Sequence, residues 1–235
     1  MNNFYIIGTP IGNLKDISSR ALSTLKEVDF ILCEDTRVTK KLLGKYEITT
    51  PTLSYHSFSG NFKTQKILDL LEEGKNLALV SDAGTPAISD PGFQLVLRIR
   101  EKFGDNVKIT PIPGPSALIT ALSASGLPAD QFLFLGFLPH KKGKQTILKE
   151  IANSNRTVAF YESPHRVMKT LKLLQEQLDE AGQMENKKIV VAKELSKIHE
   201  QIIAGNILEI ILYLEKNPDK IKGEFVILVS GKNKV

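Results

Sequence analysis

Five short apolar segments, separated by helical patterns, constrain the fold of the first half of this chain most strongly. They lie at residues 4–7, 29–33, 52–55, 76–80 and 107–112. Between the first two, the apolar residues Ile17, Ala21, Leu25 and Val28 recur with the spacing of one helix face. Short apolar strands that alternate with amphipathic helices predict a mostly parallel sheet covered on both faces.

Three local signals predict where helices of this first half begin and end. Asp16 precedes the first helical pattern and is a candidate N-cap. Gly74 follows the third helical pattern, as a glycine at C′ does. Asp90 followed by Pro91 predicts the start of a helix that runs to about Phe103.

The second half of the chain has a different order of patterns, and we expect a mixed sheet there. Its predicted strands lie at residues 132–135, 157–161, 189–192, 201–204 and 225–229. Its predicted helices lie at residues 116–125, 145–152, 167–178 and 207–215. The spacing of the third and fourth strands suits an antiparallel hairpin. Three prolines and a glycine within residues 111–116 indicate a boundary between two α/β domains, residues 1–114 and 115–235.

Composition and charge exclude several classes of protein. The chain is 42% hydrophobic and 24% charged, and no apolar run approaches the ~18 residues of a membrane span. The first residues do not resemble a signal peptide, and a single cysteine permits no intrachain disulfide, so we expect a cytoplasmic protein without a membrane partner. Four scattered histidines have no ligand spacing, so we expect no metal site. The net charge of +5 modestly favours a polyanionic partner.

Glycine and polar residues are concentrated directly after the predicted strands of the first half. These segments are residues 8–13, 34–37, 56–57, 81–92 and 113–116. The carboxyl ends of parallel strands meet at one sheet edge, where α/β proteins bind their ligands. The glycine patterns of the P-loop, the Rossmann fingerprint and the nucleophile elbow are all absent, and apart from Arg37 these segments lack basic residues. The sequence therefore disfavours a phosphate cradle and predicts a ligand held by main-chain groups and small side chains.

Eight motifs, spread in order over nearly the whole chain, carry a resemblance to a known family. They are GTPIGNL at 8–14, CEDTR at 33–37, SYH at 54–56, SDAGTPAISDPG at 81–92, PIPGPSA at 111–117, FYESPHR at 160–166, AKELSKIHE at 192–200 and KGEFV at 222–226. The chain resembles the bacterial 16S rRNA ribose methyltransferases, which belong to the tetrapyrrole (corrin/porphyrin) methylase superfamily.

The resemblance implies a fold, a reaction and partners. The fold has two α/β domains with S-adenosylmethionine in the cleft between them. The reaction is methylation of the ribose 2′-oxygen of a cytidine in 16S rRNA of the 30S subunit, expected at cytidine 1402. The superfamily is dimeric, so a homodimer is expected.

The resemblance also assigns candidate residues to the cofactor and the RNA. The cofactor would contact Pro10, Gly84, Thr85, Pro86, Ala87, Ile88, Ser116, Ala117, Tyr161, Ala192, Gly223, Glu224 and Phe225. RNA phosphates would contact basic side chains in two clusters, namely Arg37, Lys40, Lys41, Lys141, Lys142 and Lys144. Charge runs are often simply solvated surfaces, and glycines often serve turns alone.

A hydroxyl is a weak nucleophile, so a base or a very close approach is required. Glu34, Asp35 and His56 are the candidate bases at the predicted edge, and Glu162 and His165 are alternatives from the second domain. Each candidate also has a purely structural interpretation.

Asp35 is also a candidate N-cap, Arg37 a candidate partner for Glu34, and Glu162 a hydrogen-bond acceptor. One position departs from the family, because Ser57 stands where an acidic residue follows the histidine of SYH.

Two other functions stay open at this point. A tetrapyrrole methylase acting on carbon would share the fold and cofactor but would have an apolar, roomy cleft instead of basic rims. A non-catalytic RNA-binding module would bind RNA and transfer no methyl group.

Overall fold

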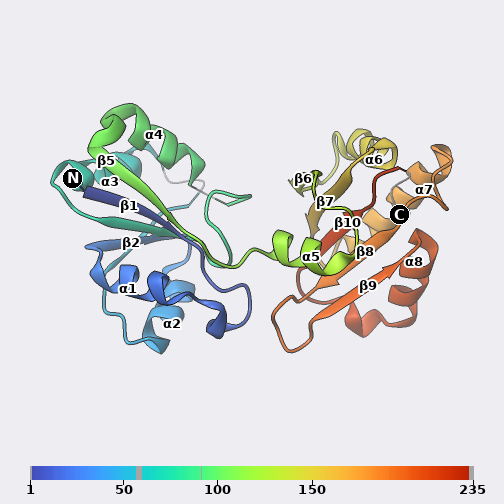
Figure 1. Cartoon of the computed structure of the whole chain (residues 1–235), viewed down its shortest axis with the longest axis horizontal. Helices are drawn as coiled ribbons and strands as arrows, with labels where there is room; N and C mark the ends of the chain where they lie inside the picture. Colours follow the sequence, from blue (N-terminus) through green and yellow to red (C-terminus); the bar gives the residue numbers. More distant parts are fainter. Residues whose placement is uncertain (1, 57–59, 91, 233–235) are drawn as a thin grey trace. The chain divides into compact units, whose positions relative to one another are not determined.

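A computed structural model describes residues 2–56, 60–90 and 92–232 of the chain. The chain divides into two compact units, Met1–Ser116 and Ala117–Val235 (Figure 1). We had expected the division after residue 114. Each unit is described by itself below.

The first unit contains a five-stranded sheet in the order β3-β2-β4-β1-β5. Its strands are β1 (Asn2–Ile7), β2 (Phe30–Cys33), β3 (Thr52–Ser54), β4 (Leu77–Val80) and β5 (Val107–Ile112). All the pairings among these strands are parallel, which confirms the predicted parallel sheet. The carboxyl ends of β2, β4 and β1 therefore lie side by side at one edge.

Helices cover both faces of this sheet, as the alternating pattern predicts (Figure 1). Leu77 and Leu79 of β4 pack against α3 (Asn61–Glu72) and α4 (Phe93–Phe103). Ala78 and Val80, whose side chains point the other way, pack against α1 (Ser19–Glu27) and α2 (Thr36–Lys45). Each face thus has its own apolar core, and the polar loops are left at the edges.

The helix ends correct two of the three predicted signals. Asp16 is not the N-cap of α1; it lies in a 3-10 helix (Leu14–Asp16), and the hydroxyl of Ser18 accepts the capping bond from the Ala21 N–H at 3.1 Å. Gly74 follows the end of α3 with φ +86°, which confirms the C′ glycine. Pro91 lies outside the described residues.

The N-cap of α4 is Gly92 and not Asp90, so the helix starts later than predicted. Gly92 has φ +135°, and a Cβ there would lie 2.8 Å from a methyl group of Leu79. A glycine is therefore required where the loop meets the buried face of the sheet.

The second unit contains a five-stranded mixed sheet in the order β6-β7-β10-β8-β9. Its strands are β6 (Phe132–Phe137), β7 (Thr157–Glu162), β8 (Ile189–Lys193), β9 (Gln201–Gly205) and β10 (Phe225–Val229). β6 and β7 pair in parallel and the other pairs are antiparallel, including the predicted β8–β9 hairpin. β6 continues two residues beyond its predicted end, through a register shift between Phe134 and Phe137.

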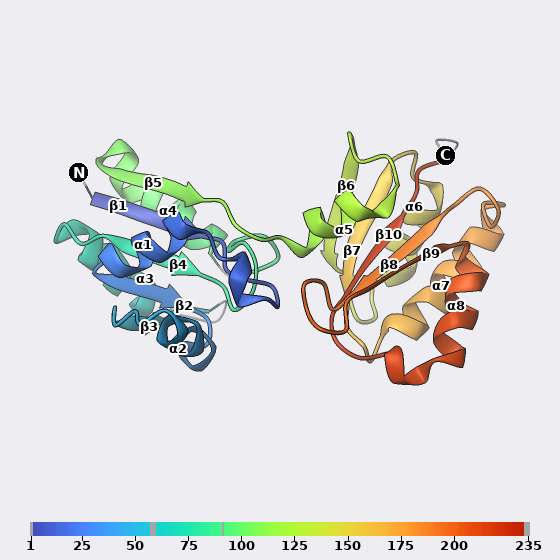
Figure 2. The ribbon, with the colours of Figure 1, turned by 60° about the horizontal axis from the view of Figure 1, so that its bottom comes forward.

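Three helices, α6 (Lys144–Asn153), α7 (Val167–Glu180) and α8 (Ile207–Lys216), bury one face of this sheet (Figure 2). Alternate residues of β10, such as Val226 and Leu228, are buried on the other face, where α5 (Ala117–Ser125) packs against β9 and β10. Short 3-10 helices also lie at Gly104–Asn106 and Pro218–Lys220. No helix within the described residues has the length and apolarity needed to cross a membrane.

Candidate active site

The loops after β1 and β4 are joined by a two-residue bridge between Thr9 and Gly84. The Thr9 N–H donates to the Gly84 carbonyl at 2.8 Å, and the Gly84 N–H donates back to Thr9 at 3.1 Å. The hydroxyl of Thr9, which is 2% exposed, donates to the Ser81 carbonyl at 3.1 Å. Buried hydrogen bonds of this kind hold the two loops in one arrangement.

The loop after β5 approaches the same place through Gly8 and Gly114. A Cβ on Gly8 would lie 2.8 Å from Cα of Gly114, so the two main chains meet where no side chain fits. The hydroxyl of Thr85 donates to the Pro115 carbonyl at 3.3 Å. Thr85 thereby lies next to the chain segment that leads into Ser116, and the structure brings these two predicted cofactor residues together.

The loop that follows β4 has an unusual main-chain conformation. Gly84 has φ +86°, and the non-glycine residues Ala87 and Ser89 have φ values of +69° and +63°. Positive φ costs a non-glycine residue on the order of 1 kcal/mol and is concentrated at ligand sites. Ile88, between the two, exposes half of its side chain. This conformation fits a ligand-binding loop, and contacts of its main-chain groups with a ligand stay a prediction.

Glu34 lies near Asp82 and Asp90 beside this loop, because β2 and β4 are neighbours in the sheet. Partial burial, together with the charges of Asp90 and Asp82, raises the pKa of Glu34 to about 7. Burial, together with Asp82, likewise raises the pKa of Asp90 to about 6. A carboxyl group with a pKa near neutrality is well suited to accept a proton at physiological pH.

The environment of Asp35, unlike that of Glu34, stabilises the charged carboxylate. Its carboxylate accepts a bond from the Arg37 N–H at 2.8 Å as the N-cap of α2, and it forms an ion pair with the Arg37 guanidinium at 2.6 Å. These bonds lower the pKa of Asp35 to about 2. The N-cap interpretation is confirmed, and the alternative pairing of Arg37 with Glu34 is wrong. Of the two adjacent acids, Glu34 is the better candidate base.

His56, the third candidate base, follows β3 and is half-buried. Because β3 pairs with β2, His56 belongs to the same edge as Glu34. Ser57, the residue that departs from the family pattern, lies outside the described residues.

In the second unit, two predicted cofactor residues lie in one row of the sheet. Tyr161 of β7 and Ala192 of β8 both pair with Val226 of β10, from either side. Phe225 is different, because its ring is 1% exposed within the core on the opposite face. A ligand on the Tyr161 face would therefore reach only the main chain of Phe225, and the cofactor contact of Phe225 stays a prediction.

Gly223 and Glu224 are held by Glu194, which follows β8. The Glu224 N–H donates to the Glu194 carboxylate at 3.1 Å, and Lys197 bridges both acids at 2.9 and 3.0 Å. Gly223 has φ +82°, and a Cβ there would overlap the Glu194 carboxylate. The predicted cofactor segment thus has a fixed conformation that depends on glycine.

Lys144 corrects the predicted RNA contacts. It is 6% exposed, and its ammonium donates to Thr170 at 2.6 Å and lies 3.5 Å from the Glu162 carboxylate. Glu162 is itself buried, and Arg166 pairs with it at 2.6 Å. Lys144 is therefore not available to a phosphate, and Glu162 is occupied as an internal acceptor. The other predicted RNA contacts are exposed: Arg37, Lys40, Lys41, Lys141 and Lys142.

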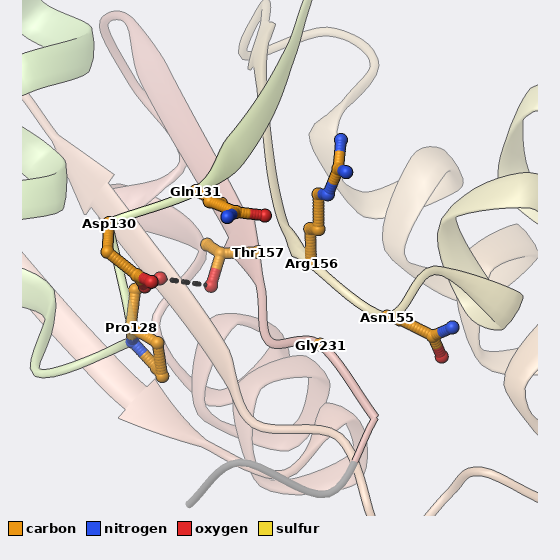
Figure 3. Close-up of a pocket in the computed structure, with 7 residues that line it drawn as sticks. All are labelled: Pro128, Asp130, Gln131, Asn155, Arg156, Thr157 and Gly231. Atoms are coloured by element: carbon orange, nitrogen blue, oxygen red, sulfur yellow. Dashed lines mark hydrogen bonds between the residues drawn. The ribbon is translucent and has the colours of Figure 1, made fainter.

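A cavity of about 230 Å³ lies elsewhere in the second unit (Figure 3). Its lining includes Asp130, Gln131 and Arg156, and the Thr157 hydroxyl donates to the Pro128 carbonyl at 2.6 Å beside it. It lies at the start of β7, whereas Tyr161 lies near the end of that strand. The cavity is therefore separate from the predicted site residues.

Comparison with known proteins identifies the family. The model of the tetrapyrrole (corrin/porphyrin) methylases matches residues 3–211. The chain belongs to this methylase family.

Curated relatives of this family member match nearly its whole length. Ribosomal RNA small subunit methyltransferase I of Thermotoga maritima is 43% identical over 99% of this chain and 100% of its own length. The proteins of that name from Vibrio cholerae and Synechocystis are 49% and 47% identical over 97% and 98% of this chain, and 76% and 80% of their own.

Solved methylases share the fold at low sequence identity. Cobalt precorrin-4 methyltransferase superposes with a TM-score of 0.70 at 20% identity, over 97% of this chain and 94% of its own. Uroporphyrin-III-C-methyltransferase from Thermus thermophilus gives 0.62 at 17% identity, over the same shares. These similarities show the two-domain α/β fold and carry nothing about the substrate.

The residues at the sheet edge fit a methyl donor that carries a positive charge. The segment from Ser81 to Asp90 contains no basic residue and two acids, Asp82 and Asp90, whose charges reach Glu34 of the neighbouring loop. Within the part of the chain that the structure describes, no group of three or more histidine, cysteine or acidic side chains is arranged to hold a metal ion.

Sequence reasoning missed Asp82 and Asp90 as members of this cluster. Both are visible as acids after the fourth apolar segment. Their proximity to Glu34 depends on the strand order, which the sequence does not reveal.

Proposed function

We propose that this methylase transfers the methyl group of S-adenosylmethionine to the ribose 2′-oxygen of a cytidine in 16S rRNA, at cytidine 1402. The observation that carries the proposal is the match of nearly the whole chain, at 43–49% identity, to proteins named for methylation of small-subunit ribosomal RNA. A ribosomal substrate would place the reaction in the cytoplasm. The homodimer and a cofactor cleft between the domains stay predictions.

The cofactor supplies a methyl group on a sulfonium centre, and the chain supplies its position and a proton acceptor. The main-chain groups of Gly84, Ala87 and Ile88, in the strained loop after β4, hold the methionine part. Thr85 and Ser116, which the Thr85–Pro115 bond brings close, hold it from the side of β5. Tyr161, Ala192 and Gly223 contact the adenosine.

Glu34 accepts the proton of the attacking 2′-hydroxyl. With a pKa of about 7, Glu34 is deprotonated in a large fraction of molecules at neutral pH and still retains affinity for a proton. Asp35 keeps Arg37 in place at the start of α2, so Arg37 presents a positive charge beside the same edge. Exposed Lys40 and Lys41, on α2, extend this basic surface for RNA phosphates.

Methyl transfer from labelled S-adenosylmethionine tests the proposal. The substrates are 30S subunits from a strain that lacks the modification, and free 16S rRNA. We expect label in the RNA of at least one substrate, and labelling slower by ~100-fold or more with the Glu34→Gln variant, which should still bind the cofactor.

The two alternative functions are outcomes of the same assay. Absence of label in both RNAs, from protein that binds cofactor, contradicts the proposal. A binding module would retain RNA without transferring label. A methylase acting on carbon would label a tetrapyrrole instead.

A further inference from the structure

An aromatic cluster in the second unit joins Tyr161, a predicted cofactor contact, to two phenylalanines that have no role in the site described above. The ring of Tyr161 lies between two phenylalanine rings, with centroid distances of 5.0 Å to Phe134 and 5.4 Å to Phe137. Phe137 exposes 58% of its surface, whereas Phe134 and Tyr161 are half-buried. An exposed ring supported from behind by a second ring is a flat surface at which a further aromatic group can stack.

A β-bulge produces this arrangement. Phe134 pairs with Ala159, and Phe137 pairs with Tyr161, so three residues of β6 span two of β7. In a regular strand, residues three apart point to opposite faces. The extra residue brings Phe134 and Phe137 to the same ring, and Gly136, with φ +60°, provides the conformation that the bulge needs.

The segment around the cluster is basic. From residue 131 to residue 144 the chain has no acid, and it carries exposed Lys141 and Lys142 beyond the end of β6. Lys141 is four positions after Phe137, so the chain places their Cα atoms at most about 14 Å apart. Exposed aromatic rings next to lysines are the combination that binds single-stranded nucleic acid, by base stacking and phosphate contacts.

We propose that Phe137, held against Tyr161 by the β6 bulge, stacks on an unpaired nucleobase of the RNA substrate, while Lys141 and Lys142 contact the adjoining phosphates. The proposal rests on the RNA substrate of the proposed function and adds the residue that recognises a base in unpaired form. Stacking is insensitive to base identity, so Phe137 selects unpaired nucleotides and not a sequence.

The absence of tryptophan from the chain provides a direct test. The Phe137→Trp variant carries a single indole at the proposed stacking position, and stacking quenches its fluorescence. The matched control is Leu212→Trp on α8, at a side chain 52% exposed on a helix that covers the other face of the same sheet. A short single-stranded oligoribonucleotide, 30S subunits and S-adenosylmethionine are the three titrants.

We expect RNA to quench the Phe137→Trp variant and to leave Leu212→Trp unchanged. RNA that binds without quenching overturns the stacking proposal alone. Quenching by S-adenosylmethionine instead of RNA also overturns it, because the ring then belongs to the cofactor site. If the wild-type chain binds neither RNA, the proposed function fails together with this inference.

A second variant tests the proposal independently, in case Phe137→Trp does not fold. Phe137→Leu keeps an apolar side chain but removes the ring, and we expect it to weaken RNA binding by about 5- to 100-fold. Cofactor affinity and the circular dichroism spectrum should stay those of the wild type. Leu212→Ala is the control, and equal RNA affinities of Phe137→Leu and the wild type would contradict the proposal.

Discussion

Glu34 and Asp35 are adjacent in the chain, but the pKa values of their carboxyl groups are shifted in opposite directions. Asp35 is bound by the N–H and guanidinium of Arg37, and its pKa falls to about 2. Glu34 lies in a partly buried environment near two other acids, and its pKa rises to about 7. The first is a helix cap, and the second is available for proton transfer.

This difference predicts the pH dependence of the reaction. A base acts only when deprotonated, so kcat/KM should increase as pH rises to about 7 and level off above it. Glu34→Gln should lower kcat by ~100-fold or more, with cofactor affinity retained, because general-base catalysis contributes about 10²–10⁴-fold. Single-turnover methyl transfer between pH 5.5 and 8.5 measures both effects.

Asp35→Asn is the matched control for Glu34→Gln. It removes a neighbouring charge and should keep the pH profile of the wild type. A Glu34→Gln enzyme with wild-type rate, or a profile that moves with Asp35 instead, would assign the proton transfer elsewhere.

The buried group formed by Glu162, Lys144, Thr170 and Arg166 predicts a large effect on stability. Glu162→Gln removes the charge that balances two cations, and breaking a buried ion pair in this way typically costs about 3–5 kcal/mol. Thr170→Val removes only the hydrogen bonds that Thr170 makes with Lys144 and Glu162. Their loss should lower the free energy of unfolding by about 1–3 kcal/mol. Urea unfolding of the variants measures the difference, and equal losses would mean that the charge balance is unimportant.

The close approach of Gly8 and Gly114 predicts that a single methyl group disrupts the site. Gly8→Ala would place a Cβ 2.8 Å from the Gly114 main chain, so the loops must separate. We expect lower thermal stability and loss of cofactor binding. Gly44→Ala is the control, because its Cβ meets nothing within 4 Å on α2 and should stabilise the helix by about 1 kcal/mol. Cofactor binding by Gly8→Ala with wild-type affinity would contradict this account of the loops.

Lys187 predicts a stability change at alkaline pH. Its ammonium is buried and donates to the carbonyls of Ser154 and Ser230 at 2.7 Å, and burial lowers its pKa to about 8. Below pH 8 both folded and unfolded chains are protonated at this residue, whereas from pH 8 to 10 the unfolded chain binds more protons. Stability should therefore rise with pH in that window, by up to about 2 kcal/mol.

The Lys187→Met variant isolates this contribution. The difference in unfolding free energy between wild type and variant should change in favour of the wild type as pH rises from 8 to 10. A difference that is constant with pH would mean that Lys187 is not buried in its charged form.

The elements of the fold could be predicted because they depend on short-range patterns. The helical period, the strand alternation and Gly74 are visible in neighbouring residues, and so is the concentration of small residues around Gly84 and Thr9. The N-cap of α1 was harder, since Asp16 and Ser18 both suit the role and only the position of the first helical turn decides between them.

The parts that could not be predicted depend on contacts between distant residues. Asp82 and Asp90 raise the pKa of Glu34 only because β4 lies between β2 and β1. Lys144 resembles the exposed lysines before it, and its burial is set by Glu162, 18 residues later. The side of the sheet to which Phe137 belongs follows from a bulge, which reverses the pattern that simple alternation gives.

The chemical position of the transferred methyl group tests the central claim most directly. A 2′-O-methyl group removes the nucleophile that alkali uses to cleave RNA, so a methylated ribose leaves one resistant linkage. Alkaline hydrolysis of the labelled 16S rRNA should give the label in a single dinucleotide that begins with cytidine 1402. Label in a mononucleotide, which places the methyl group on a base, or in a dinucleotide from another position would contradict the account.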